Sequence, residues 1–304
     1  MKSINISTDN KFSYIYALIA VLFWSTVASA FKLTLNYFSF IELLFFSSFF
    51  STVCFFLVLL LQKKIYLVFK SDRKILLKAA FLGCLNPFLY YLVLFKSYSI
   101  LPAQIAQVLN YTWPIVLVIL STIFLKQKIK KMEYAAILIS FLGAFVIISG
   151  GSLNTIVNFN SFGLILAFGS SFIWGFYWLL NLKSKVEVIV QLFLNFLFGL
   201  IYISVLYFST ISSVPDFRGI IGSAYVGCFE MGFTFILWLK AIRLSDKTSN
   251  VGNLIYLSPF LSLLLIRIFI KESIYLSTVI GLLLVVLGIL LQRKFSSSKD
   301  IGED

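Results

Sequence analysis

Histidine is absent from the 304-residue sequence, and only 12% of the residues are charged. Without histidine, the chain cannot use an imidazole as a general acid, a general base or a metal ligand. A phosphate-binding loop of the type G-x-x-x-x-G-K-S/T is also missing, which excludes ATP hydrolysis by this chain. The three cysteines, Cys54, Cys84 and Cys228, fall inside predicted membrane spans and indicate neither disulfides nor a metal site. We therefore predict no enzyme activity, no cofactor and no metal.

The scarcity of charge also decides the class of protein. Hydrophobic residues make up 60% of the chain, and the mean hydropathy is +1.00. A soluble domain needs a polar coat, which this composition cannot supply. Because a helical span needs about 20 mainly apolar residues, ten spans and short loops would use nearly the whole chain. We predict an all-α polytopic membrane protein with ten transmembrane helices at 14–31, 40–61, 75–94, 104–125, 134–148, 162–181, 188–208, 219–239, 249–270 and 276–291.

The basic residues that produce the net charge of +13 lie mostly in alternate loops between the predicted spans. If the N-terminus is cytoplasmic, the cytoplasmic loops contain most of the 25 Lys and Arg residues, including the run KQKIKK at 126–131. The other side keeps only Lys32, Lys96, Arg218, Arg267 and Lys271. This is the positive-inside pattern, so we predict a multi-pass protein of the cell inner membrane with both termini cytoplasmic. The predicted partners are the lipid bilayer and a small-molecule substrate, without nucleic acid.

The two halves of the sequence are similar when residue n is compared with residue n+145. The segment LNYTWPIVLVILSTIFLKQKI, which begins at Leu109, then aligns with LIYLSPFLSLLLIRIFIKESI, which begins at Leu254. Tyr, Pro, Phe and Lys coincide in one ungapped register, which favours a true repeat over chance similarity. We predict five-helix repeats at 1–150 and 155–293 and a disordered cytoplasmic tail at 294–304. Because five is odd, the second repeat is inverted, as in secondary transporters with a substrate site near the midplane.

Several motifs recur in the order of a known family. They are the opening ALIAVLFWSTVASAFKL, the paired YTWP and YLSP, and the similar ends of the halves, FLKQKIKKMEYAAILISFLGAFVIISGG and FIKESIYLSTVIGLLLVVLGILL. With them, the chain resembles the EamA-type transporters of the drug/metabolite transporter (DMT) superfamily. The resemblance implies a ten-span transporter of small metabolites, often an exporter, with a central cavity lined by both halves. The chain departs from the family at Gln127, where Glu is usual, and at FFSSFF (45–50), where an Arg often stands; the latter weakens the case for an anionic substrate.

One acid lies deep in an apolar run, in the sequence GCFEMGFTF. A charge near the middle of a span costs about 2.5–3.5 kcal/mol on insertion scales. We predict that Glu230 binds a cationic group of the substrate or exchanges a coupling proton; the alternative is a neutral or paired structural acid, bonded to Asn86. Glu42, near the end of its span, is predicted to be a boundary or capping residue. Helical spacing predicts one polar face in the eighth span, formed by Ser223, Gly227, Glu230, Thr234 and Trp238.

Other polar and aromatic residues of the spans are candidates for the same substrate- or proton-binding site. They are Asn86, Tyr90, Gln107, Tyr111, Trp24, Trp174, Trp178, Thr234 and Asn253. Pro87, Pro114 and Pro259 are predicted to break helices, and the backbone groups they free are tolerated only beside protein or a cavity. The alternative is an ordinary kink with interhelical hydrogen bonds, or, for the tryptophans, packing or an interfacial position.

These features predict a secondary transporter that exports small organic metabolites, such as amino acids or amines, by alternating access, with proton coupling as an option. One alternative is an uptake or exchange carrier for an adenosyl or nucleotide-like metabolite. A passive channel ranks lower, and so does an intramembrane enzyme, for which the absence of histidine and a single deep acid leave no catalytic pair. The sequence leaves a homodimer open, although it contains no G-x-x-x-G motif.

Overall fold

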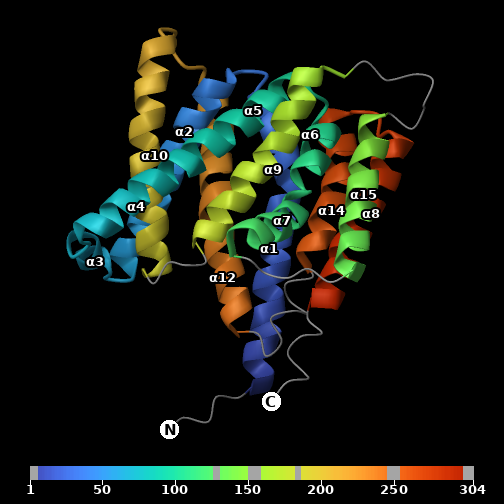
Figure 1. Cartoon of the computed structure of the whole chain (residues 1–304). Helices are drawn as coiled ribbons and strands as arrows, with labels where there is room; N and C mark the ends of the chain where they lie inside the picture. Colours follow the sequence, from blue (N-terminus) through green and yellow to red (C-terminus); the bar gives the residue numbers. More distant parts are fainter. Residues whose placement is uncertain (1–5, 126–130, 150–158, 182–185, 245–253, 297–304) are drawn as a thin grey trace. The chain divides into compact units, whose positions relative to one another are not determined.

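The computed structural model describes residues 6–125, 131–149, 159–181, 186–244 and 254–296, and every regular element in these ranges is a helix (Figure 1). Helices follow the apolar runs because a bilayer core forces each segment to satisfy its own backbone groups. In chain order they are α1 (Ile6–Thr34), α2 (Phe40–Leu61), α3 (Ile65–Phe69), α4 (Arg73–Gly83), η1 (Cys84–Leu89), α5 (Tyr90–Ile100), α6 (Ala103–Asn110), α7 (Trp113–Leu125), α8 (Lys131–Ile148), α9 (Ser161–Asn181), α10 (Val188–Thr210), α11 (Phe217–Tyr225), η2 (Val226–Phe233), α12 (Thr234–Leu244), η3 (Leu254–Leu257), α14 (Ser258–Leu265), η4 (Ile266–Ile270) and α15 (Leu276–Ser296).

Eight of the ten predicted spans coincide with described helices that are long and apolar enough to cross a membrane. These helices run over Lys11–Thr34, Phe40–Leu61, Arg73–Ile100, Ala103–Phe124, Lys131–Ile148, Ser161–Asn181, Val188–Thr210 and Phe217–Trp238. The predicted spans 249–270 and 276–291 coincide with the shorter apolar helices Leu254–Ile270 and Leu276–Gln292. The helical membrane class is confirmed, while the number of ten spans stays a prediction.

The described helices form two compact units, and each unit takes segments from both halves of the sequence. Unit 1 comprises Met1–Phe88 and Val186–Lys271, and unit 2 comprises Leu89–Lys185 and Glu272–Asp304. The predicted third span is therefore divided within η1, so that α4 belongs to unit 1 and α5 to unit 2. The predicted repeats 1–150 and 155–293 are thus stretches of sequence and do not coincide with the compact units. The helix α15 continues to Ser296, three residues into the predicted tail, and 297–304 lie outside the described residues.

In unit 1, α2 contacts α10 as well as α11 and η2, while α1 contacts α12 and α14. The helix α10 also packs on α4, and glycines permit the close approach. A Cβ atom at Gly199 would lie 2.5 Å from Cδ of Pro87, and Gly83 lies against the backbone carbonyl of Asn195. Small residues at such crossings are typical of helix packing in membranes, where association depends on close van der Waals contact.

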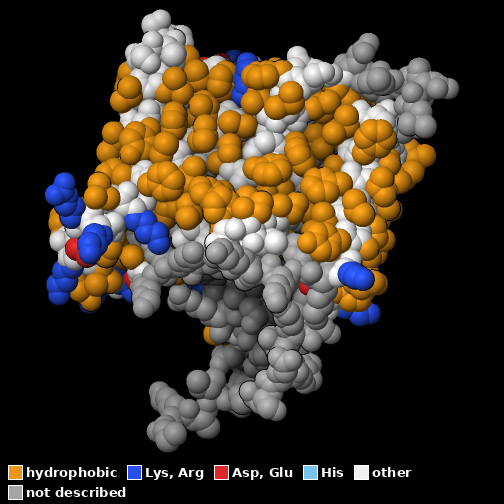
Figure 2. Space-filling model, in the orientation of Figure 1, with side chains coloured by type: hydrophobic (Ala, Val, Ile, Leu, Met, Phe, Trp, Pro, Cys, Tyr) orange, Lys and Arg blue, Asp and Glu red, His pale blue; other side chains and the backbone are white. Residues whose placement is uncertain are grey.

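In unit 2, α9 packs on α5, α6 and α7, while α8 packs on α15. The pair α8–α15 is especially close: a Cβ atom at Gly143 would lie 2.6 Å from the carbonyl oxygen of Gly281. The Ser140 hydroxyl donates a hydrogen bond to the Val285 carbonyl at 3.1 Å. Large apolar side chains remain exposed on the outer helix faces, including Leu138 and Phe145 on α8. Figure 2 shows such hydrophobic side chains over much of the visible surface, as expected for a chain surrounded by lipid.

Two pairs of predicted spans are interrupted at positions related by the shift of 145 residues. A kink at Asn86 within η1 interrupts the third span, and the π-helical segment η2 interrupts the eighth. The fourth span breaks before α7 begins at Trp113, and the ninth changes from the 3-10 turn η3 to α14 at Ser258. Pro114 and Pro259 are each the second residue of the helix that follows the break. This position suits proline, because the N–H group it lacks would have no intrahelical partner there.

Candidate functional site

Glu230 lies in η2, in the middle of the helix Phe217–Trp238, and its side chain is half-buried. A π-helix closes i→i+5 hydrogen bonds, and such segments are rare and frequent at functional sites. The hydroxyl of Thr234, the first residue of α12, donates a hydrogen bond to the Phe229 carbonyl five residues earlier. Thr234 therefore serves the helix backbone next to Glu230.

The π-helical segment changes the polar face predicted for the eighth span. Ser223 and Gly227 are buried, and a Cβ atom at Gly227 would lie 2.8 Å from Cβ of Phe50 on α2. Trp238 instead packs on α1 through Trp24. A hydrogen-bonded ring that contains an additional residue shifts the register, so spacings of three and four do not keep side chains on one face across it. The prediction of a single face from Ser223 to Trp238 assumed an uninterrupted α-helix, which η2 interrupts.

Groups from α1 and α2 surround η2 within unit 1. The Ser51 hydroxyl donates to the Met231 carbonyl at 3.0 Å, and the hydroxyls of Thr26 and Tyr225 lie 2.7 Å apart. The ring of Phe229 contacts that of Phe23, with centroids 4.8 Å apart. The neighbours of Glu230 in the chain are therefore tied to both helices.

Trp24 belongs to an aromatic cluster between α1 and α12. Its ring centroid lies 5.5 Å from that of Trp238 and 5.8 Å from that of Phe235, the latter in an edge-to-face arrangement. Trp24 is half-buried. This geometry is typical of packed aromatic pairs, which contribute about 0.5–1.5 kcal/mol beyond their buried area.

Asn86 lies at the kink of the third span, in η1. Its backbone is extended (φ −148°, ψ 119°), and the following bond to Pro87 is cis. The side chain is 1% exposed, and its Oδ1 has no hydrogen-bond partner among the described residues. Asn86 and Glu230 both belong to unit 1.

A buried amide pair on α10 escaped the sequence prediction. Gln191 Nε2 donates to Asn195 Oδ1 at 3.3 Å, and both side chains are buried within a membrane-spanning helix. Their spacing of four residues in an otherwise apolar run was the available signal, because polar side chains in spans rarely face lipid.

A polar and aromatic cluster lies in unit 2. The rings of Tyr90 and Trp174 are stacked, with centroids 4.6 Å apart and planes at 27°. The Tyr90 hydroxyl donates to Asn110 Oδ1 at 3.3 Å, and Asn110 Nδ2 donates to the Ser170 hydroxyl at 2.8 Å. Trp178 contacts Trp174 edge-to-face at 5.8 Å. Sequence reasoning selected Tyr90, Trp174 and Trp178 but missed Asn110, which joins α5 to α9.

The other predicted residues have different surroundings. Gln107 is buried on α6, and its Oε1 has no hydrogen-bond partner among the described residues. Tyr111 is the half-buried C-cap residue of α6. Asn253 lies outside the described residues. Within the described ranges, no group of three or more His, Cys, Asp or Glu side chains could hold a metal ion.

Two glutamates act as helix caps. Glu42 forms a capping box with Ser39 at the start of α2: its carboxylate accepts from the Ser39 N–H at 2.8 Å, which confirms the predicted capping role. Glu272 Oε1 accepts from the Ala103 N–H at 2.9 Å at the start of α6. Gln104 strengthens this contact, because its amide donates to the Ser273 carbonyl and accepts from the Tyr275 N–H, both at 2.9 Å.

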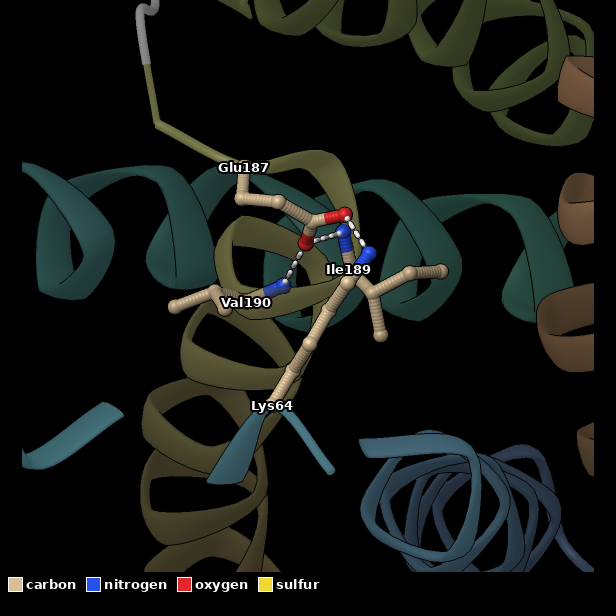
Figure 3. A network of polar contacts seen from close by, with 4 residues as sticks. All are labelled: Lys64, Glu187, Ile189 and Val190. Carbon is tan, nitrogen blue, oxygen red and sulfur yellow. Dashed lines mark hydrogen bonds and ion pairs between the residues drawn. The ribbon is translucent and has the colours of Figure 1, made fainter. Parts of the chain in front are cut away.

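A third glutamate forms an ion pair at the start of α10 (Figure 3). Glu187 accepts hydrogen bonds from the N–H groups of Ile189 and Val190, and its Oε1 lies 2.8 Å from Lys64 Nζ. Partial burial alone would raise the pKa of Glu187. The hydrogen bond from Lys64, the charge of Lys64 and the two backbone hydrogen bonds outweigh that effect and lower the pKa below its ordinary value.

Comparison with known proteins identifies relatives along nearly the whole chain. Residues 11–149 and 161–293 match the model of the EamA-like transporter family. A protein of Archaeoglobus fulgidus named "Uncharacterized transporter" is 27% identical over 279 residues, which is 91% of this chain and 96% of that protein. Proteins with similar names from Clostridium kluyveri and Bacillus subtilis are each 25% identical, over 66% and 71% of both chains respectively. One crystal structure matches with a TM-score of 0.67 at 17% identity, covering 95% of this chain and 98% of that chain, which shows likeness of fold alone.

Proposed function

Because this chain belongs to the EamA-like transporter family, we propose that it is a secondary transporter that exports a small organic metabolite by alternating access. Family membership makes the chain a membrane transporter and not an enzyme. The proposal adds the inner membrane, the outward direction and a substrate that carries a cationic amine, such as an amine or an amino acid.

The observation that carries the proposal is the position of Glu230. Glu230 is half-buried in a π-helical segment of a membrane-spanning helix. An acid in such a span is costly unless a cation or a proton neutralises it, so acids in spans are functional-site candidates. A substrate ammonium group or a coupling proton would supply that neutralisation. An anionic substrate would not.

Recurrent packing supports the inverted repeat on which alternating access depends. In unit 1, the first predicted span packs on the eighth and ninth, as α1 on α12 and α14. In unit 2, the sixth packs on the third and fourth, as α9 on α5, α6 and α7. In the repeat, the first, third and fourth spans correspond to the sixth, eighth and ninth. The contacts of the first span with the eighth and ninth therefore correspond to those of the sixth with the third and fourth. The contacts α2 on α11 and α10 on α4 are related in the same way.

The test is transport in proteoliposomes that contain the purified chain. A panel of labelled amines, amino acids and adenosyl or nucleotide-like compounds is screened by counterflow. With the selected substrate, Glu230→Gln should lower the initial rate of transport driven by a pH gradient at least tenfold. The matched control is Glu42→Gln, since Gln also completes a capping box and should keep the rate within twofold. Equal rates for wild type and Glu230→Gln would reject the assigned role of Glu230.

Two further measurements separate the roles of Glu230. If it exchanges the coupling proton, Glu230→Gln loses the response to a pH gradient but keeps substrate exchange at equal pH. If it binds the substrate's cation, both are lost. Flux that neither saturates nor shows counterflow would indicate a passive channel.

The adenosyl or nucleotide-like substrate remains the second candidate. Its strongest support is the group of aromatic rings in unit 2, because planar bases stack on such rings. However, Trp174 is 8% exposed and Tyr90 covers one face of its ring. A base would have to displace Tyr90, which places this candidate behind the amine.

A further inference from the structure

The short helix α3 occupies a membrane boundary. It lies between α2, which ends at Leu61, and α4, which begins at Arg73. Both neighbours belong to membrane-spanning helices, so the connecting residues 62–72 must lie where the bilayer meets water. None of the residues of α3 is fully buried in the protein.

An ion pair anchors the N-terminal end of α3 to α10. Lys64, the residue before α3, pairs with Glu187 at the start of α10, as Figure 3 shows. On the far side, the Asp72 carboxylate accepts a hydrogen bond from the Ile75 N–H at 2.8 Å and caps α4. Both acids near α3 therefore have a partner within the protein.

Four basic side chains around α3 are exposed: Lys63, Lys70, Arg73 and Lys74. Figure 2 shows Lys and Arg side chains gathered beside α3 and α4, with hydrophobic atoms between them. With Asp72 as the acid among them, this surface carries a clear excess of positive charge.

Large apolar side chains are exposed in the same place. Phe69 is 85% exposed, Leu61 83% and Tyr66 52%. The Lys70 Nζ atom lies 5.2 Å from the centre of the Tyr66 ring. Aromatic and aliphatic groups next to cations are the composition of segments that lie in the membrane interface.

We propose that residues 61–74 bind anionic phospholipids. Leu61, Tyr66 and Phe69 enter the boundary between headgroups and acyl chains, while the four cations contact phosphate groups. Each Lys or Arg near a negatively charged membrane surface contributes about fivefold in affinity. A zwitterionic lipid gains only the apolar contacts, so the surface discriminates by headgroup charge.

The test measures lipid binding to the purified full-length protein in neutral detergent. Phosphatidylglycerol and phosphatidylcholine are titrated separately, and bound lipid is counted by native mass spectrometry. Phosphatidylglycerol should bind at least tenfold tighter. The combined substitution Lys63→Gln, Lys70→Gln, Arg73→Gln and Lys74→Gln should remove that preference. The matched control removes four exposed basic residues elsewhere: Lys11, Lys131, Lys240 and Lys294. It should change the affinity by less than about threefold.

Two more measurements distinguish a site for phospholipid from a site for free phosphate. Tyr66→Ser with Phe69→Ser should weaken phosphatidylglycerol binding severalfold, because the apolar contacts are lost. Inorganic phosphate at millimolar concentration should compete poorly. Effective competition would mean a site for phosphate ions and would overturn the lipid assignment, as would equal losses in the two four-residue variants. If a variant fails to fold, lipid binding to the wild type is measured at a higher salt concentration instead, because salt screens the charges. A preference for phosphatidylglycerol that salt does not reduce would also overturn the proposal.

Discussion

The Glu272 carboxylate accepts a hydrogen bond from the Ala103 N–H at 2.9 Å, across 169 residues of sequence. The N-cap residue of α6, Pro102, has no side chain that could cap the helix. A carboxylate from the connection before α15 performs this task. It satisfies a backbone donor that the helix leaves unpaired and complements the positive end of the helix dipole.

We predict that Glu272→Ala lowers the free energy of unfolding by about 0.5–2 kcal/mol, the usual range for loss of a cap. Glu272→Gln should cost less, because an amide oxygen still accepts the hydrogen bond. Thermal unfolding in detergent measures the loss, and amide hydrogen exchange locates it. Faster exchange at Ala103 in Glu272→Ala is the expected signature, and unchanged exchange there would contradict the capping role.

Gly143→Ala should destabilise unit 2. The added Cβ would lie 2.6 Å from the Gly281 carbonyl oxygen, so α8 and α15 must separate. Such overpacking costs about 1–3 kcal/mol. The control is Gly169→Ala on α9, where a Cβ meets nothing within 4 Å. It should be neutral or slightly stabilising, since Ala is the better helix former. Thermal unfolding that ranks the two variants in the opposite order would contradict the close packing.

The Lys64–Glu187 pair predicts a loss of stability in acid. The pKa of Glu187 is lowered in the folded protein, so its contribution is complete above the ordinary carboxyl pKa of about 4.3. The contribution disappears as the pH falls through the lowered pKa. Glu187→Gln should therefore be less stable than wild type at pH 7, and the difference should shrink as the pH falls below the ordinary carboxyl pKa of about 4.3. Unfolding temperatures measured from pH 7 to pH 3 test this, and a constant difference would contradict it.

The cluster in unit 2 predicts that stacking matters more than the hydroxyl of Tyr90. Tyr90→Phe removes a hydrogen bond of 3.3 Å and should cost no more than about 0.6 kcal/mol, the mean for hydrogen bonds between membrane helices. Trp174→Ala removes a buried ring that contacts Tyr90, Tyr177 and Trp178, and should cost about 3–5 kcal/mol. Thermal unfolding of the two variants gives the comparison. A larger loss in Tyr90→Phe would show that the hydrogen bond dominates.

Much of the fold could be predicted from local sequence. Apolar runs predict helices reliably because the bilayer admits few other structures. The shift of 145 residues also anticipated the related breaks before Trp113 and Ser258, since a proline in the interior of a helix removes a backbone hydrogen bond and so favours a break just before it. The capping role of Glu42 followed from its place near a helix end.

The candidate site was less predictable, because its geometry depends on contacts between distant segments. Glu230 was visible as an acid in an apolar run, but its π-helical segment was not. Asn110, the amide pair Gln191–Asn195 and the cap supplied by Glu272 were missed, since each depends on which helices meet.

The sequence by itself determined that this chain is a helical membrane protein with a single acid deep in a span, because burial of apolar side chains and the cost of charge in lipid act on each segment separately. Only the tertiary structure decided which segments pack together. Each compact unit contains parts of both halves of the sequence, and the Glu272 carboxylate caps the distant helix α6. The reason is physical: association of helices in lipid depends on close packing and polar contacts between particular side chains, which hydropathy does not encode.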